Sequence, residues 1–281
     1  MGKWYNKIFI GNPNKEDFTS KDLPKTRVEQ FFDVVKLRFS GMVTGNLLYA
    51  LFALPLVLWG LYYWFAVVQL EKEIALDQLF GEGSTVLSFL SLCVPLYVIT
   101  GPAKAGLYYC IRNWIWNERA AVSEHFWKEF KRSWKQALVL NFISAGLLYS
   151  GLWWMLFCYL NASQFPILKF IAIFVGFILV LYFMSSIYHF PQLVTYKLKV
   201  SQILKNSLIY LAVQFPRTLI ACIIYVALIA LCVVLSQVLL VVALTLGVSF
   251  VFLAQMILSD FLFDKYVNKP EERRKGMAPL E

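Results

Sequence analysis

Charged residues are scarce in this chain of 281 residues. Asp, Glu, Lys and Arg together make up 15% of it, whereas hydrophobic residues make up 59%. Soluble domains carry roughly a quarter charged residues, so the composition excludes an ordinary water-soluble fold. Lipid is the simplest solvent for the surplus of apolar surface.

The chain also lacks the residues and motifs on which most enzyme chemistry depends. It has two histidines and five cysteines, and no two cysteines have CxxC spacing, so we expect neither a metal site nor a disulfide framework. No phosphate-binding loop, HExxH, GxSxG or GxGxxG pattern is present. We therefore expect no enzymatic activity, no catalytic residue and no cofactor.

Long uncharged segments dominate what is there. Two of them, Gly41 to Leu70 and Thr218 to Ser259, are too long for core helices of a soluble fold. About 20 helical residues cross a hydrocarbon core of roughly 30 Å. We predict an all-α polytopic membrane protein with six transmembrane helices, near residues 44–68, 84–103, 137–160, 170–194, 216–235 and 238–259. The last two divide one uncharged run at Ser236 and Gln237.

The positive charges alternate between the predicted loops. Of the 26 Lys and Arg residues, all but Lys72 and Lys169 lie in residues 1–40, 104–135, 197–217 and 265–281. Loops rich in Lys and Arg remain in the cytoplasm, so we predict a multi-pass protein of the cell membrane with both termini cytoplasmic. The net charge of +9 thus has a topological explanation, and we expect no nucleic-acid partner.

The chain is therefore predicted to consist of three parts. They are a cytoplasmic tail with an amphipathic helix at residues 1–40, a six-helix membrane domain at 41–259, and a cytoplasmic tail at 260–281. Thr26 and Glu29 form a capping-box pattern that opens the first amphipathic helix. We expect this helix to lie along the membrane surface, with an apolar stripe formed by Val28, Phe31, Phe32, Val35 and Phe39.

A second amphipathic helix is predicted to run into the third span. Its apolar positions are Phe126, Phe130, Trp134 and Ala137, and its other sides carry Glu129 and several cations. We expect anionic lipid headgroups or a partner protein to contact the cations of the cytoplasmic segments. These are Arg112, Lys128, Lys131, Arg132, Lys135 and Lys205.

Two features could mark a pathway through the membrane. Thr100, Gly101 and Pro102 interrupt the end of the second span. They indicate either a helix exit at the membrane interface, which is the simpler interpretation, or a break that lines a binding cavity. We expect close helix packing at Gly106. His189 is the one ionisable candidate in the fourth span, and a neutral histidine bonded to a neighbouring helix is the alternative.

The two halves of the chain share a short pattern. Lys135-Gln136-Ala137-Leu138 and Lys205-Asn206-Ser207-Leu208 each follow a basic stretch and precede apolar residues. The pattern is compatible with an internal duplication.

Several longer motifs resemble those of a known family. In the first half they are Asn46-Leu47-Leu48-Tyr49, Leu54-Pro55, Thr100-Gly101-Pro102-Ala103-Lys104-Ala105-Gly106-Leu107-Tyr108-Tyr109, Arg112-Asn113 and Phe126-Trp127-Lys128-Glu129-Phe130-Lys131-Arg132-Ser133-Trp134-Lys135-Gln136. In the second half they are Phe190-Pro191, Leu204-Lys205-Asn206-Ser207-Leu208 and Pro216-Arg217-Thr218-Leu219. Their order and spacing resemble the YesL-like family of bacterial membrane proteins over most of residues 40–260.

The resemblance implies a context rather than a mechanism. The YesL-like family is of uncharacterised function, occurs mainly in Gram-positive bacteria, and is often found beside sugar-importing ABC transporter components and glycan-degrading enzymes. Together with the missing catalytic motifs, this context favours an accessory membrane protein of oligosaccharide uptake or utilisation that acts with ABC transporter subunits. One alternative is a stand-alone carrier or channel with the Thr100–Gly106 segment and His189 in its pathway, and another is a membrane scaffold or sensor. The solute, the partner and the oligomeric state stay open.

Overall fold

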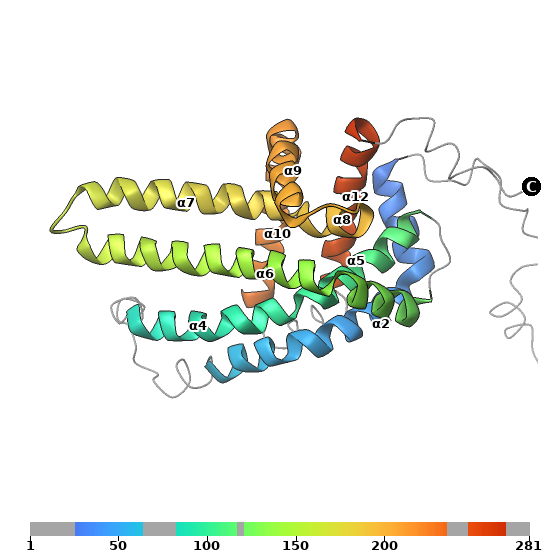
Figure 1. Ribbon diagram of the computed structural model, residues 1–281, viewed down its shortest axis with the longest axis horizontal. Coiled ribbons are helices and arrows are strands. Elements are labelled where there is room, and N and C mark those ends of the chain that lie inside the picture. Colours follow the sequence, from blue (N-terminus) through green and yellow to red (C-terminus); the bar gives the residue numbers. More distant parts are fainter. Residues whose placement is uncertain (1–25, 64–82, 117–120, 235–246, 268–281) are drawn as a thin grey trace, which may run out of the picture.

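The computed structural model describes residues 26–63, 83–116, 121–234 and 247–267 (Figure 1). These residues are helical almost throughout and contain no strand, which confirms the all-α prediction. The helices are α2 (Arg27–Tyr63), α4 (Gly83–Ile99), α5 (Gly101–Ile115), α6 (Val122–Asn161), α7 (Ile167–Ser186), α8 (His189–Thr195), α9 (Val200–Val213), α10 (Phe215–Val234) and α12 (Val248–Tyr266).

Four long helices run side by side in the order α2, α4, α6, α7 (Figure 1). The turn between α6 and α7 lies at the left end of this layer in Figure 1, and the N-terminal ends of α2 and α6 lie at the right. α5 and α8 are short helices that contact each other toward the right. α12 packs on α2, α5 and α8, and α9 packs on α7 and α8. The short helices are therefore enclosed by the longer ones.

Three helical segments are long and apolar enough to cross a membrane, namely α2, α6 and the stretch Ile167–Thr195 that contains α7 and α8. The number of candidate spans rises to five if each pair of consecutive helices that meet at a bend is counted as one span. α4 and α5 meet at 46°, and α9 and α10 meet at 101°. The predicted second and fifth spans are thus parts of broken helices. The predicted sixth span begins in residues 235–246, outside the described residues, so the count of six and the orientation stay predictions.

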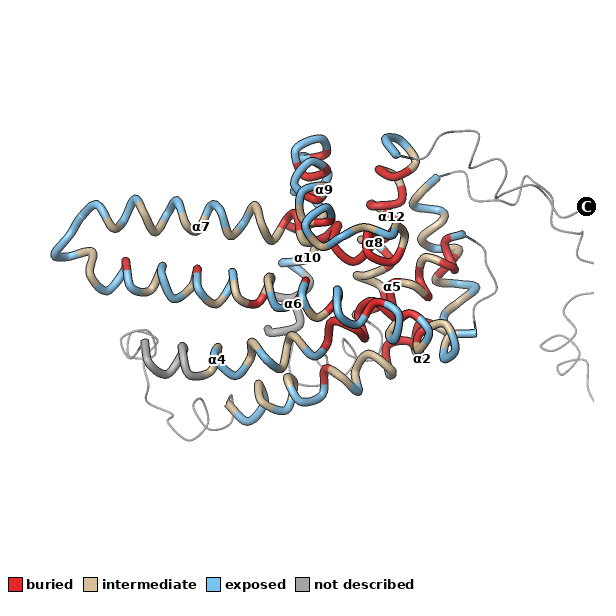
Figure 2. The backbone as a smooth tube through the Cα atoms, viewed as in Figure 1, coloured by how far each residue is buried: buried red, intermediate tan, exposed pale blue. Residues whose placement is uncertain are grey.

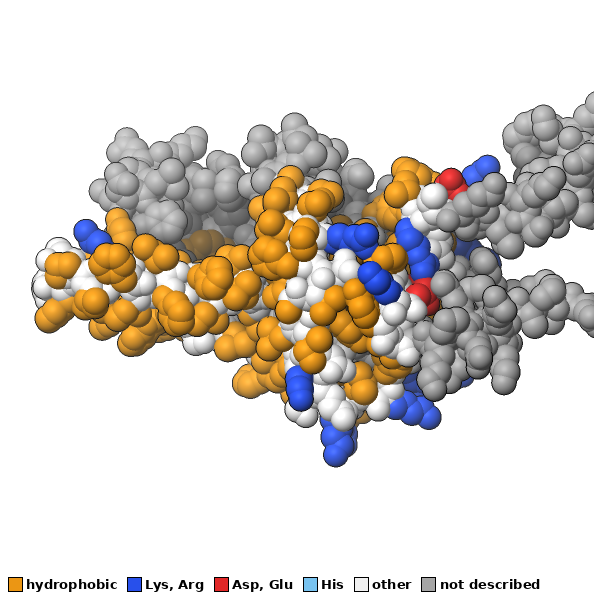
Figure 3. Space-filling model, turned by 90° about the horizontal axis from the view of Figure 1, so that it is seen from above, with side chains coloured by type: hydrophobic (Ala, Val, Ile, Leu, Met, Phe, Trp, Pro, Cys, Tyr) orange, Lys and Arg blue, Asp and Glu red, His pale blue; other side chains and the backbone are white. Residues whose placement is uncertain are grey.

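Apolar side chains cover the outside of the long helices. Along α7 only Met184 and Ser185 are buried, and Phe170 and Ile173 are 71% and 70% exposed. Figure 2 shows that buried positions gather around α5 and α8, away from the α6–α7 turn. On the face seen in Figure 3, hydrophobic side chains cover the arm at the left, and Lys and Arg gather mainly toward the other end. A helix surface of this kind fits contact with lipid rather than with water.

The centre of the fold is α5. All of its residues except Tyr109 and Arg112 are buried. We expected Lys104 to Lys135 to lie in a cytoplasmic loop; the cytoplasmic side stays a prediction, and residues 104–115 form a buried helix instead of an exposed loop. The segment forms a helix because Ala103, Leu107, Ile111 and Trp114 recur at helical spacing. It lies in the interior because α2, α6, α8 and α12 surround it.

The start of α2 confirms the predicted capping box. The Glu29 amide donates to Thr26 Oγ1 over 3.1 Å, and the Thr26 amide donates to the Glu29 carboxylate over 3.4 Å. The surface helix and the first span are one helix with a non-helical residue at Arg38. Phe31 and Val35 pack on the core as the stripe predicts. Val28, Phe32 and Phe39 are exposed, so only part of the stripe faces the protein.

Charged groups join α2 to α12. Arg27 Nη1 lies 2.8 Å from Asp260 Oδ2, and Arg27 also pairs with Asp264. The indole of Trp116, just after α5, donates to Asp260 Oδ1 over 3.1 Å. The buried carboxylate of Asp260 therefore has a cation and an indole N–H as partners, and it holds the ends of three segments together.

Candidate solute-binding cavity

A cavity of about 380 Å³ lies inside the helix bundle. Residues from α2, α4, α5, α6, α7, α8, α10 and α12 line it. Most of the lining is apolar or aromatic, and it includes the tyrosines Tyr97, Tyr108, Tyr149, Tyr182 and Tyr225. Two ionisable nitrogen-bearing side chains, Lys104 and His189, also line it. The volume is within the range of small-molecule sites, which are largely apolar with a few placed polar groups.

The break between α4 and α5 forms one wall of the cavity. Thr100 Oγ1 donates to the Tyr97 carbonyl over 2.7 Å. The Asn141 amide of α6 donates to the same carbonyl over 3.0 Å and to Thr100 Oγ1 over 3.2 Å. The break frees backbone groups from the helical ladder, and these side chains satisfy the Tyr97 carbonyl. The bend is therefore fixed by α6.

Two glycines allow α5 to approach α6 closely. A Cβ atom at Gly101 would lie 2.6 Å from the Ala137 carbonyl oxygen, and one at Gly106 would lie 2.9 Å from the Phe126 carbonyl oxygen. The Thr100–Gly106 segment is buried throughout. The segment is therefore packed against α6, and its interpretation as an interface exit stays a prediction. The expectation of close packing at Gly106 is confirmed.

Pro102 shares this interior position. It lies in the first turn of α5, where helices leave amide groups without an intrahelical acceptor, so its missing N–H costs no helical hydrogen bond. Pro102 does not line the cavity, and neither do Thr100, Gly101 and Gly106. Along the chain, these four residues lie between the lining residues Tyr97, Lys104 and Tyr108.

Lys104 projects from α5 to the cavity. The residue is only 8% exposed. Its Nζ lies 3.9 Å from the centroid of the Tyr97 ring and 3.5 Å from Asn141 Oδ1. The ion pairs of the described chain use Arg27 and Arg132 as cations, and none uses Lys104. We counted Lys104 among the cations of a cytoplasmic loop and did not predict its burial, for which the small residues around it were the signal.

His189 lies at the start of α8, on the same cavity. The residue is 2% exposed, and its ring meets that of Tyr182 edge-on at 5.7 Å. Its Nε2 atom has no hydrogen-bond partner within the described ranges. The structure thus brings His189, a predicted pathway residue, to one cavity with Lys104, which we did not single out.

Two pairs of other polar groups of the lining are hydrogen-bonded to each other. Ser144 and Tyr182 share a hydrogen bond of 2.9 Å between their hydroxyl groups. The Tyr108 hydroxyl donates to Gln255 Oε1. These pairs connect α6 with α7 and α5 with α12, so they stabilise the walls.

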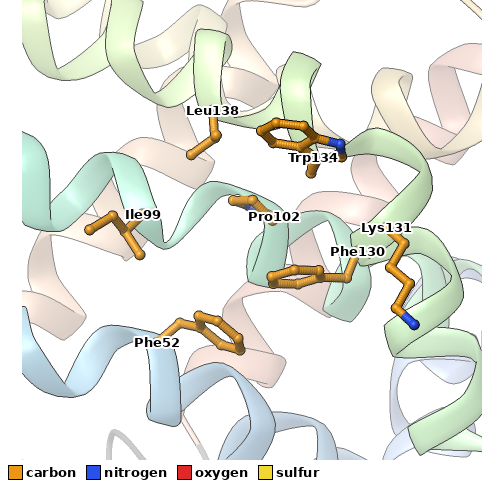
Figure 4. A pocket seen from close by; sticks show the side chains of 7 residues that line it. All are labelled: Phe52, Ile99, Pro102, Phe130, Lys131, Trp134 and Leu138. Carbon is orange, nitrogen blue, oxygen red and sulfur yellow. The ribbon is translucent and has the colours of Figure 1, made fainter.

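A second hollow opens on the outer surface (Figure 4). It measures about 420 Å³, and Lys131 is the charged residue of its lining. The apolar lining comes from α2, the α4–α5 break and α6, and consists of Phe52, Ile99, Pro102, Phe130, Trp134 and Leu138.

Most of the predicted lipid-facing or partner-facing cations are exposed. They are Lys128, Lys131, Arg132, Lys135 and Lys205. Arg112 differs, because its Nη1 donates to the Val194 carbonyl over 2.7 Å and its guanidinium stacks on Tyr109 and Trp116. It links α5 to α8 instead of projecting outward.

Glu129 also differs from the prediction. We placed it with the cations on the polar sides of the amphipathic helix, but it is fully buried. It accepts a hydrogen bond from Ser133 and pairs with Arg132 at 2.8 Å. A buried carboxylate needs such partners, and Ser133 and Arg132 supply them from the same helix.

The chain is similar to a family described as a protein of unknown function, DUF624, whose model matches residues 42–155. The match contains the α4–α5 break and Lys104, and it ends within α6. Comparison with curated proteins and with solved structures gave no match. The similarity supports an uncharacterised family and says nothing of its chemistry.

Proposed function

We propose that this protein is a multi-pass protein of the cell membrane that carries a small solute through the cavity between its broken helices. The observation that carries the proposal is the position of Lys104 and His189, both buried, on one cavity. Ionisable groups are costly inside a membrane domain and are usually retained for function. Transporters commonly build their sites from interrupted helices. We further propose six spans with both termini in the cytoplasm, as the distribution of positive charge predicts.

Cysteine accessibility tests the carrier. In a cysteine-free background, single cysteines at Ser144 and Ser186 would report on the cavity, which both residues line. Phe174 of α7, which is exposed on the outer apolar surface, is the control position. We expect an impermeant thiol reagent to label Ser144→Cys and Ser186→Cys from each side of the membrane and to leave Phe174→Cys unlabelled. If neither lining position reacts from either side, the cavity is sealed and the carrier proposal is rejected.

The same background tests the orientation. Ser123 lies at the start of α6 and Ser163 lies in the turn after it. We expect the impermeant reagent to label Ser163→Cys, and not Ser123→Cys, in intact cells. The reverse pattern would overturn the proposed orientation while leaving the cavity test unaffected.

An accessory role beside an ABC-type sugar importer is the second proposal. It rests on the resemblance to the YesL-like family and on the exposed cations along the first turns of α6, Lys128, Lys131 and Lys135. If these cations hold a partner, importer subunits will co-purify with the wild type in mild detergent and will be lost when the three lysines are changed to Glu. Equal recovery with both proteins argues against this role and leaves the carrier, or a scaffold or sensor that uses another surface.

A further inference from the structure

The charge of Lys104 lacks a counterpart in the cavity. The nearest polar and aromatic groups are the amide oxygen of Asn141 at 3.5 Å and the ring of Tyr97 at 3.9 Å. Neither carries a formal negative charge, and the described residues of the lining include no Asp or Glu. A buried ammonium group is costly without an anionic partner. The missing charge is therefore one that a ligand can supply.

A second group without a partner, His189, lines the same cavity. The ring of Phe190, the neighbour of His189, is 5.6 Å from Lys104 Nζ. His189 Nε2 is buried and has no partner among the described residues. Buried polar atoms are nearly always hydrogen-bonded. The side chains of Ser144 and Tyr182 are hydrogen-bonded to each other, and so are those of Tyr108 and Gln255. Of the two ionisable nitrogen-bearing side chains on this cavity, Lys104 therefore has no anionic partner and His189 Nε2 has no hydrogen-bond partner among the described residues.

These two groups define the class of ligand. One cation balances one negative charge, so a monoanion fits and a dianion would leave an excess charge in an apolar surrounding. The remaining lining is aromatic and aliphatic and suits an organic body with a ring, an alkyl chain or hydroxyl groups. We infer that the solute is a small organic monocarboxylate, with its carboxylate held by Lys104 and approached by His189. This inference rests on the proposed carrier function and names its substrate class.

The first test needs no ligand. Lys104→Met keeps the length of the side chain and removes its charge, and Lys205→Met makes the same change at an exposed position on α9. If the charge of Lys104 has no partner in the absence of an anionic ligand, then removing that buried charge should raise the thermal unfolding midpoint of the detergent-solubilised protein by a few degrees. Lys205→Met should leave it unchanged. A lower midpoint for Lys104→Met would show that Asn141 and Tyr97 make Lys104 a structural residue, and it would overturn the inference.

The second test adds three carboxylates that differ in the part of the molecule attached to the carboxylate. Gluconate, benzoate and hexanoate are each compared with the corresponding primary amide, which has nearly the same shape and no charge. We expect at least one carboxylate to raise the midpoint of the wild type and of Lys205→Met, its amide to have no effect, and Lys104→Met to lose the response.

Three results would contradict the inference. They are equal shifts with carboxylate and amide, a full response in Lys104→Met, and no response to any of the three carboxylates. The carrier is judged separately, because two-sided labelling of Ser144→Cys would still support it. In that case the cavity would take an uncharged solute.

Discussion

Replacing Gly101 by alanine should force α5 away from α6. The new Cβ would lie 2.6 Å from the Ala137 carbonyl oxygen and 2.9 Å from its carbonyl carbon. Both atoms belong to the backbone of α6, so no side-chain rotation can relieve the contact, and the helices must separate by several tenths of an ångström. Overpacking of this kind costs about 1–3 kcal/mol. In a chain of this size that corresponds to a midpoint lower by about 2–10 °C.

The control is Gly146→Ala, because a Cβ atom there would meet nothing within 4 Å. Alanine is favoured over glycine inside a helix by about 1 kcal/mol, so this variant should be as stable as the wild type or more so. Thermal unfolding of the three proteins in one detergent gives the comparison. If Gly101→Ala unfolds at the temperature of Gly146→Ala, the two helices do not approach as described, and the reasoning about the break fails with it.

Three further predictions follow from other contacts. Pro102→Ala should change the unfolding midpoint by less than the Gly101 variant, since proline in the first turn of α5 interrupts no helical hydrogen bond. Arg27→Gln should lower stability by about 1–2 kcal/mol, because it removes the cation beside the buried Asp260 while part of the arginine is in contact with solvent. Lys36→Gln on the exposed side of α2 is its control, and equal midpoints would show that the ion pair adds nothing. Changing three exposed cations to Glu should reduce the anionic lipid that co-purifies with the protein, because each contributes about 1 kcal/mol near an anionic leaflet. The three are Lys128, Lys131 and Lys135. Unchanged lipid content by mass spectrometry would contradict it.

Hydropathy was sufficient to find the long helices. α2, α6 and α7 have lengths and compositions that only lipid-facing helices share, and the amphipathic start of α6 followed from Phe126 and Phe130 at helical spacing. The capping box at Thr26 was equally local, because both hydrogen bonds join residues three apart. Features that depend on neighbours along the chain were therefore predictable.

The interior was not predictable in the same way. A helix that is surrounded by protein needs no apolar segment long enough to cross the bilayer, and its sequence can contain charged residues. The sequence of α5 therefore resembled that of a basic loop. Lys104 and Arg112 were interpreted as topological signals, yet one faces a cavity and the other binds the Val194 carbonyl. The small residues Gly101, Ala103 and Gly106 were the signal that could have shown close packing.

The helix breaks that follow α4 and α7 have the same construction. α4 and α7 are long apolar helices, and each is followed by a short buried helix with a proline in its first turn, Pro102 in α5 and Pro191 in α8. Backbone that leaves the helical ladder is tolerated at membrane depth only where protein or a cavity surrounds it. The stacked rings of Tyr108 and Phe190, 5.7 Å apart, join the two short helices in the interior. This arrangement buries Lys104 and His189 among the helices and places both on one cavity, where we propose that a solute meets their charge and hydrogen-bonding capacity.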